Sequence, residues 1–428
     1  MKLSPKSGMV ETGFAYSSQM VTILTGIAIQ SCLAWFLGPA GRGSYAVCLV
    51  FGYILGILVS LGIDGALQYY VASKKLNISQ CISFALVIAI ILGLLGMLLG
   101  FVMLEIKVEF FTKASRQAFT VALLYIPVSV LDAIFTKLFI GLREFKWLGI
   151  FSLIKGGVNL ISIVIALYFL SSGVVGALLA ITLSWLITII LELIYIHKKY
   201  HFRLQWLTKK QVSEVFNYGK RFYFTRLGNV MNSQIGTVIL AFFLQPSDIG
   251  YYAVATKLGA YIIIIPDAVG NVLLSRIIMS NNGRSELVAR CSRICGIICG
   301  MAIIFLLCTI KPLVLILLSP SFLPIIPLVW LLSPGVFIRC PSKIMIPYFN
   351  GTNRPEISSL ATIAGVSANL LALLLLLPLL GLKGGALAMT LGYITSSIIL
   401  VAYFIKLSDI SMSALFHFKK TDLFFLKG

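Results

Sequence analysis

Residues 37–47 read LGPAGRGSYAV and residues 244–254 read LQPSDIGYYAV, so six of the eleven positions return at a constant offset of 207. Further matches follow in chain order at a similar offset: Phe139-Ile140-Gly141 with Phe349-Asn350-Gly351, Asn159-Leu160 with Asn369-Leu370, and Gly176-Ala177-Leu178 with Gly385-Ala386-Leu387. The Pro and Gly of each first loop are also what a tight turn needs. A turn does not explain the order of the matches, which predicts an internal duplication.

Composition places most of the chain in lipid. Of 428 residues, 59% are hydrophobic and only 11% are charged, more apolar than a soluble core of this size requires. Apolar stretches of about 20 residues recur from end to end, and each is long enough for a helix to cross a membrane. They lack the alternation of membrane strands, so we predict an all-α membrane protein. The expected spans are residues 11–37, 43–72, 79–104, 117–141, 148–170, 174–196, 214–244, 250–278, 290–310, 324–349, 357–379 and 383–405.

Twelve spans and the repeat predict two six-helix lobes. Residues 1–196 form the N-terminal lobe, 197–217 a charged cytoplasmic linker, 218–406 the C-terminal lobe and 407–428 an interfacial cytoplasmic tail. Polar residues interrupt the first apolar run, so we interpret it as an uncleaved helix. With six spans each, both halves enter from the same side, which is a parallel repeat. Folds of this kind place a substrate cavity between the lobes.

Charge distribution sets the orientation. The formal net charge is +20, and about 20 of the 34 Lys and Arg fall in one set of alternating loops and tails, which marks that set as cytoplasmic. The chain is then a multi-pass protein of the cytoplasmic (inner) membrane, and both of its termini are cytoplasmic. Inside-positive topology and contact with anionic lipid account for the basic loops. We therefore infer no nucleic-acid partner.

A cavity between the lobes would be lined by polar residues on equivalent helices. Gln19 and Thr22 share one face of the first helix with Gly26, and adding 207 gives Arg226, Asn229 and Ser233 on the seventh. Small polar residues of this kind also simply hold membrane helices together. Buried cations attract phosphate or carboxylate groups, so Arg226, Lys257 and Lys155 are our candidates for the cavity.

Other ionisable residues at membrane depth have simpler explanations. Long side chains near helix ends reach the membrane surface, and we expect this of one group: Asp64, Lys137, Glu192, Arg339 and Lys343. Lys257 and Asp267 stand ten residues apart on one helix, too far to pair directly. Carboxylates at depth are also candidates for coupling to a proton or ion gradient, and here they are Asp64, Asp132 and Asp267.

No pattern in the chain indicates an enzyme, a metal site or a cofactor. Cys291, Cys295 and Cys299 share a helical face, but the segment lacks further ligands and small buried residues explain the spacing. The three histidines all fall on the predicted cytoplasmic side, and paired catalytic carboxylates are missing. We predict a protein with no catalytic residue, no metal and no cofactor.

Three stretches resemble the polysaccharide repeat-unit flippases (Wzx type) of the multidrug/oligosaccharidyl-lipid/polysaccharide exporter (MOP) superfamily. They are Leu37-Gly38-Pro39 through Gly43-Ser44-Tyr45 to residues 61–72 (LGIDGALQYYVA), residues 250–258 (GYYAVATKL) with Ile265-Pro266, and Pro320-Ser321-Phe322 through residues 331–335 (LLSPG) to residues 351–354 (GTNR). Together they span nearly the whole chain. Where the family often has a proline at the end of the eighth helix, this chain has Leu273-Leu274-Ser275-Arg276.

The resemblance implies two lobes in a V around a cationic central cavity, alternating access, and a polyprenyl-pyrophosphate-linked oligosaccharide as cargo for O-antigen, lipopolysaccharide, capsule or exopolysaccharide synthesis. A polysaccharide polymerase and a chain-length regulator would be its protein partners. The open alternatives are a multidrug or metabolite exporter or a peptidoglycan lipid-precursor flippase of the same superfamily, and a membrane-embedded polymerase or ligase. The excess of cations within the helices favours an anionic cargo over cationic drugs.

Overall fold

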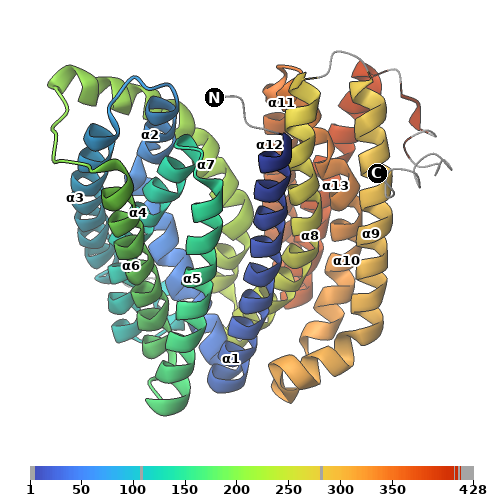
Figure 1. The fold of residues 1–428 in the computed structure, drawn as a ribbon. Helices are drawn as coiled ribbons and strands as arrows, with labels where there is room; N and C mark the ends of the chain where they lie inside the picture. The colour runs from blue at the N-terminus through green and yellow to red at the C-terminus, as the bar shows by residue number, and fades with distance from the viewer. Residues whose placement is uncertain (1–4, 107–108, 280–282, 409, 413–414, 416–428) are drawn as a thin grey trace. The chain divides into compact units, whose positions relative to one another are not determined.

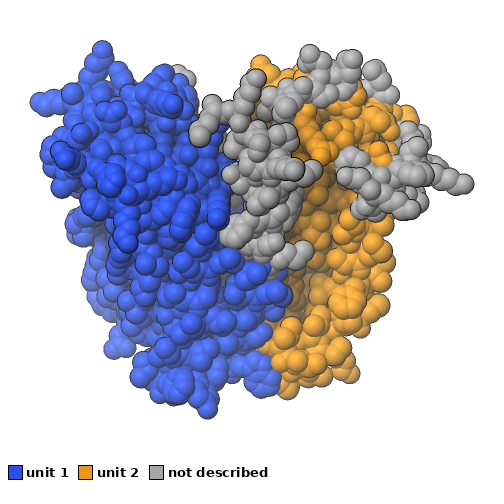
Figure 2. All heavy atoms as spheres, viewed as in Figure 1, with its two compact units in different colours: residues 1–250 blue, residues 251–428 orange. Residues whose placement is uncertain are grey.

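The computed structural model describes residues 5–106, 109–279, 283–408, 410–412 and 415, and this described chain is helical, without strands. It divides into two compact units, Met1–Gly250 and Tyr251–Gly428, each considered by itself below (Figures 1 and 2). This division is based on packing, whereas the predicted lobes are based on the repeat. The lobe boundaries stay a prediction.

Unit 1 contains α1 to α7. The helices are α1 (Pro5–Ser60), α2 (Ile63–Ala72), α3 (Ile78–Leu104), α4 (Arg116–Gly141), α5 (Phe145–Val164), α6 (Gly173–Tyr200) and α7 (Lys209–Phe243), with a short 3₁₀ helix η1 (Glu109–Lys113) and a π-helical turn η2 (Ile165–Phe169). The helix α1 has two arms, because Gly38 adopts φ 61° and ψ −177° just before Pro39. Glycine takes that conformation without strain, and the chain turns back there (Figure 1).

Unit 2 contains most of α8 and all of α9 to α13. The helices are α8 (Pro246–Met279), α9 (Arg284–Leu313), α10 (Ile325–Lys343), α11 (Met345–Gly351), α12 (Pro355–Leu380) and α13 (Leu382–Leu407), with η3 (Val314–Leu318) and η4 (Pro320–Phe322) after α9. Fully buried Phe349 and Phe404 pack with Cys295, Cys299 and Cys340 in its core. The predicted tail after 415 lies outside the described residues.

The number of membrane crossings agrees with the sequence prediction. Ten helices of the described chain are long and apolar enough to span a membrane. Counting both arms of α1 and adding α7, whose C-terminal third is apolar over Ser233–Phe243, gives twelve. The prediction of an all-α membrane protein is therefore confirmed.

The structure differs from the predicted spans in two places and adds detail to the linker. The span 43–72 breaks at Leu61-Gly62, where both residues have positive φ, and 324–349 divides at Ile344 into α10 and α11. The expected linker 197–217 is mostly helical, since α6 continues to Tyr200 and α7 begins at Lys209. Hydropathy does not detect these changes, because a charged helix end and a charged loop have the same composition.

Backbone conformation supports the internal repeat. Arg143 and Asn353, which stand 210 positions apart, both have φ 61°, and Ser171 and Gly381, at the same offset, have φ 46° and 54°. Residues other than glycine rarely adopt positive φ, so the coincidence of two such pairs is informative. The turns after α4 and α11, and those before α6 and α13, are therefore equivalent.

The two repeated loops also contact each other reciprocally within unit 1. A Cβ added to Gly43 would lie 1.7 Å from the carbonyl oxygen of Pro246, and one added to Gly250 would lie 2.1 Å from that of Pro39. Each glycine thus meets the partner loop at the equivalent position. Such reciprocity is expected where two copies of one sequence motif meet.

One end of unit 1 is strongly basic. The loops 73–77, 142–144 and 201–208 gather there, and the backbone amides of Arg203 and Gln205 donate to Ser79 Oγ and Ser83 Oγ at the start of α3. We call this the basic end. Its cations are Lys74, Lys75, Arg143, Lys146, Lys198, Lys199, Arg203, Lys209 and Lys210.

Candidate functional site

An ion pair joins α7 to α2 inside unit 1. The guanidinium of Arg226 contacts the carboxylate of Asp64, whose side chain is only 4% exposed against 24% for the arginine. The other carboxylate oxygen, Oδ1, has no hydrogen-bond partner among the described residues. Asp64 lies in the first turn of α2, where the helix dipole also favours a negative charge.

Two glycines bring these helices close enough for the pair to form. A Cβ on Gly62 would lie 2.2 Å from the carbonyl oxygen of Gly219 on α7, and one on Gly65 would lie 2.7 Å from the ring of Phe222. Without side chains at Gly62 and Gly219 the backbones touch, and Arg226, two turns after Gly219, reaches Asp64. Asp64 is at a helix end as predicted, but it is buried.

A second ion pair lies between α4 and α5. Lys155 Nζ is 2.5 Å from Asp132 Oδ1, and the same ammonium group lies 4.5 Å from the centroid of the Trp185 ring on α6. Both side chains are largely buried. Glu192 on α6, with 3% exposure, interacts electrostatically with both members of the pair.

The sequence prediction for Glu192 was wrong. We expected it near a helix end and reaching the membrane surface, but it lies on the buried face of α6. The signal that identifies this face is a run of small and polar residues at four-residue spacing, Ala180, Ser184 and Thr188, which leads to Glu192. A stripe of that spacing is one helical face.

Unit 2 contains a third ion pair. Lys343 Nζ lies 2.6 Å from Oδ1 and 2.8 Å from Oδ2 of Asp267, linking the end of α10 to α8. Lys343 thus sits at a helix end as predicted. Arg339 does not: it is 8% exposed and donates a hydrogen bond of 2.9 Å to Ser396 Oγ on α13. Lys257 is exposed on α8, 6.0 Å from the ring centroid of Tyr261.

The predicted polar stripe is described only in part. Thr22 Oγ1 and Ser152 Oγ on α5 are 3.5 Å apart, and Ser233 Oγ donates to the carbonyl oxygen of Val230 on its own helix. The side chains of Gln19 and Asn229 lie outside the described residues. Thr22 therefore holds two helices together, and a cavity-lining role for the stripe stays a prediction.

The three pairs change how the charged residues are interpreted. Sequence reasoning separates them into cations for a cavity and carboxylates for ion coupling, yet Arg226 binds Asp64, Lys155 binds Asp132 and Lys343 binds Asp267. A pair is far cheaper to bury than either charge alone. Any anion that binds one of these cations must compete with a carboxylate already in place.

A polar cluster stabilises the basic end. Glu144, in the turn before α5, accepts hydrogen bonds from Tyr195 at 3.0 Å, from Tyr200 at 2.6 Å and from Lys199. Burial favours the neutral acid, but the hydrogen bonds from Lys199, Tyr200 and Tyr195 outweigh it and lower the pKa of the Glu144 carboxyl below its ordinary value. The cluster fastens the end of α6 to the turn between α4 and α5.

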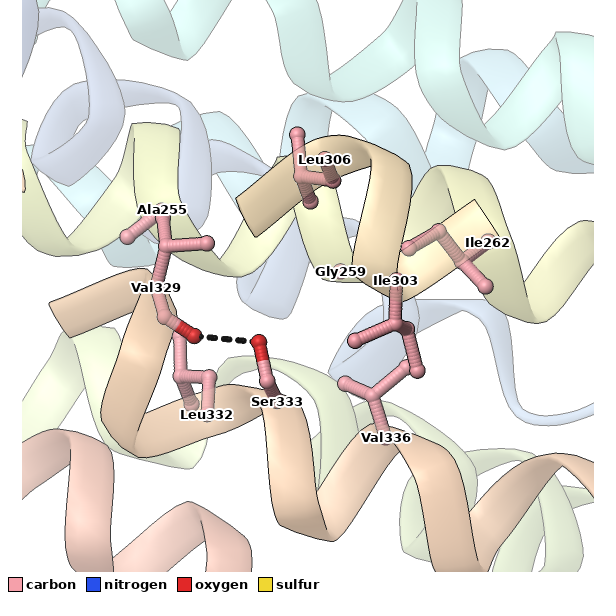
Figure 3. Close-up of a pocket in the computed structure, with 9 residues that line it drawn as sticks. All are labelled: Ala255, Gly259, Ile262, Ile303, Leu306, Val329, Leu332, Ser333 and Val336. Carbon is pink, nitrogen blue, oxygen red and sulfur yellow. Dashed lines mark hydrogen bonds between the residues drawn. The ribbon is translucent and has the colours of Figure 1, made fainter. Parts of the chain in front are cut away.

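Unit 2 encloses a small apolar cavity that is not a substrate site. It measures about 10 Å³ and lies between α8, α9 and α10, where Ser333 donates its hydrogen bond to the carbonyl oxygen of Val329 (Figure 3). That volume holds about one water molecule at most. Among the described residues there is also no group of three or more His, Cys, Asp or Glu placed to hold a metal ion.

Comparison with known proteins identifies the family. Residues 11–266, more than half of the chain, match the model of the polysaccharide biosynthesis protein family. The chain belongs to the polysaccharide biosynthesis protein family. No curated protein matches it.

The chain shares its fold with solved transporters. The lipid II flippase MurJ in an inward closed conformation is 14% identical, with TM-score 0.75 over 96% of this chain and 95% of that one. An inward-facing multidrug resistance MATE family transporter of the MOP superfamily is 16% identical, with TM-score 0.72 over 94% and 98%. The MATE transporter VcmN of Vibrio cholerae, in its bent form, is 14% identical, with TM-score 0.60 over 96% and 100%.

The family match and the fold place this polysaccharide biosynthesis protein in the MOP superfamily, as the sequence resemblance predicted. It is a multi-pass membrane protein. The proteins to which it is similar are transporters and flippases rather than enzymes. Its substrate does not follow from the fold.

Proposed function

We propose that this protein flips polyprenyl-pyrophosphate-linked oligosaccharide repeat units across the cytoplasmic membrane for the synthesis of a surface polysaccharide. The observation that carries the proposal is the match of residues 11–266 to the polysaccharide biosynthesis family. The sugar head of such a lipid cannot cross hydrocarbon unaided, while its polyprenyl tail can stay in the bilayer. A duplicated membrane protein with buried cations suits that cargo.

Buried cations are the proposed contact for the diphosphate. Arg226 and Lys155 each hold a carboxylate in unit 1, and an incoming diphosphate offers more charge and more acceptor oxygens than the aspartate it would displace. Lys257, exposed on α8, is the third proposed cation, and Thr22, Ser233, Asn229 and Gln19 are the proposed polar neighbours.

Displacement also suggests how transport is coupled. When the cargo draws Arg226 away, Asp64 loses its partner inside the membrane, where an unpaired carboxylate is costly. Proton or cation binding would relieve that cost. Asp132 and Asp267 stand in the same relation to Lys155 and Lys343, so the three aspartates are the proposed coupling groups.

The basic end of unit 1 is proposed to face the cytoplasm. Nine Lys and Arg in its loops and helix ends satisfy the positive-inside rule. Both termini would then be cytoplasmic, and the cargo would be released toward the polysaccharide polymerase and chain-length regulator proposed as partners.

Deletion of the gene tests the proposal. Surface polysaccharide is expected to disappear while polyprenyl-linked repeat units accumulate, and plasmid-borne protein is expected to restore export. Arg226→Ala and Lys257→Ala should fail to restore it, whereas Lys209→Ala, an exposed cation at the start of α7, should succeed. If the polymer is unchanged and the cells become sensitive to a toxic compound, the protein is a drug exporter instead. If peptidoglycan precursor accumulates, the protein is a precursor flippase.

A further inference from the structure

The buried cluster around Glu192 has an unbalanced charge. It brings together Asp132 from α4, Lys155 from α5 and Glu192 from α6, which is two carboxyl groups and one ammonium group. The ammonium is already bound at 2.5 Å by Asp132 and faces the Trp185 ring. Glu192 Oε2 is buried and has no hydrogen-bond partner among the described residues.

These three residues lie at one depth within unit 1. Asp132 is nine residues before the end of α4, Glu192 is eight before the end of α6, and Lys155 is ten after the start of α5. All three helix ends belong to the basic end, so the cluster lies about 12 to 15 Å inside it at 1.5 Å per residue. This places the cluster about two to three helical turns away from the basic end.

We propose that Glu192 is an exchangeable proton-binding site of unit 1, held neutral by a proton while Lys155 stays paired with Asp132. An ionised carboxylate that is 3% exposed, with one oxygen that has no hydrogen-bond partner in the part of the chain that the structure describes, is the costly alternative. With the proton on Glu192 the cluster is neutral: one ammonium, one carboxylate and one carboxylic acid. Glu192 therefore extends the coupling proposed above, which names only aspartates.

Neighbouring titratable groups fit this assignment. The charged groups that face Glu192 from the helices packed on α6 are Asp132 and Lys155. Helix α1 brings Tyr45 and Tyr53 toward Tyr125 of α4, which interacts with Asp132. These electrostatic partners include no second cation that would balance the negative charge of an ionised Glu192. Removing the charge of Lys155 would leave two carboxyl groups without a cation, and Asp132 would then take up a second proton.

The infrared C=O stretching band of protonated carboxylic acids reports this site directly in the purified full-length protein. At neutral pH we expect a band that is missing in Glu192→Gln. Asp132→Asn alone should also lose it, because Glu192 would then ionise and pair with Lys155. Lys155→Met should double its amplitude, and adding Asp132→Asn to Lys155→Met should return it to the single value. The Glu192 band should vanish reversibly as the pH is raised, because the proton is exchangeable.

Three results would overturn the proposal. A spectrum unchanged by Glu192→Gln would show that Glu192 is ionised. A band that persists at every pH where the protein stays folded would make the proton a fixed structural element. Loss of the band on adding sodium chloride, but not the chloride of a bulky organic cation, would make the site a sodium site. If Glu192→Gln does not fold, the spectra of Lys155→Met and of the double variant Lys155→Met with Asp132→Asn decide, because the proposal predicts a doubled and a single amplitude for them.

Restoration of polysaccharide export in the deletion strain is a second test of the proposal, and it rests on the proposed function. Glu192→Gln should fold but restore no polysaccharide to the deletion strain, whereas Glu356→Gln, at an exposed position in the first turn of α12, should restore it. Full export by Glu192→Gln would separate Glu192 from coupling. If deleting the gene leaves the polymer unchanged, the proposed function fails, and the infrared bands still decide the proton site.

Discussion

Three aspartates at membrane depth are each paired with a cation on another helix. Asp64, Asp132 and Asp267 are bound by Arg226, Lys155 and Lys343. Sequence reasoning names all six of these residues, but it does not predict which of them pair. Spacing along one helix predicts which side chains share a face, whereas Asp64 and Arg226 are 162 positions apart and meet only because Gly62 and Gly219 let two backbones touch.

Neutralising one member of the Asp64–Arg226 pair should destabilise the folded protein more than replacing both members. Asp64→Asn leaves Arg226 without its counter-charge, and breaking a buried pair in this way costs about 3 kcal/mol. The double variant Asp64→Leu with Arg226→Met should recover most of that loss. Thermal unfolding in detergent measures both, and a wild-type midpoint for Asp64→Asn would contradict the pairing.

Glu144 makes the basic end sensitive to acid. Its pKa is lowered in the folded protein, so its ionised form contributes stability that is complete above the unfolded value and is lost as the pH falls through the folded one. Wild type should therefore exceed Glu144→Gln in thermal stability at pH 7. The difference should shrink once the pH falls below about 4.3, the ordinary value for glutamate. A difference that does not change with pH would assign the contribution to packing.

At the scale of elements, the duplication predicted from short matches is visible in the backbone. Equivalent turns share positive φ at Arg143 and Asn353, and the two first loops meet through Gly43 and Gly250. Hydropathy locates the helices because each must cover a hydrocarbon core. It misses the break at Leu61-Gly62 and the helical ends of the linker, since backbone turns and charged helix ends leave little trace in composition.

Gly43→Ala should therefore be much more harmful than an ordinary glycine substitution. Its Cβ would overlap the Pro246 carbonyl, and forced repacking costs about 1 to 3 kcal/mol or more. Gly157→Ala on α5 is the matched control, because nothing lies within 4 Å of an added Cβ there, and alanine favours a helix by about 1 kcal/mol. Equal unfolding temperatures for the two variants would argue against the loop contact.

For the whole molecule, the positive charge of the basic end predicts orientation. In a variant whose native cysteines are replaced, Thr112→Cys, in η1 at the opposite end of unit 1, should react with a membrane-impermeant maleimide in intact cells. Arg203→Cys, in the basic loop 201–208, should react only after the membrane is opened. The reverse pattern would invert the proposed topology.

Fold and family were predictable from the chain at this scale, because apolar spans, repeat and motifs are properties of sequence order. The partner of each buried charge was not, and Glu192 was misplaced because its distance from a helix end says nothing of which face is buried. The cargo is even less predictable from the fold, since transporters of similar shape carry different substrates.

Flipping by the purified protein tests the central claim most directly. The protein is reconstituted into vesicles that contain a polyprenyl-diphosphate-linked oligosaccharide with a fluorescent sugar, and a reagent that cannot cross the membrane quenches the fluorophores exposed outside. Vesicles with the wild-type protein should lose the protected half of the signal over time, while Arg226→Ala vesicles should keep it, as empty vesicles do. Equal protection in wild-type and empty vesicles under an imposed proton gradient of either direction would contradict the account.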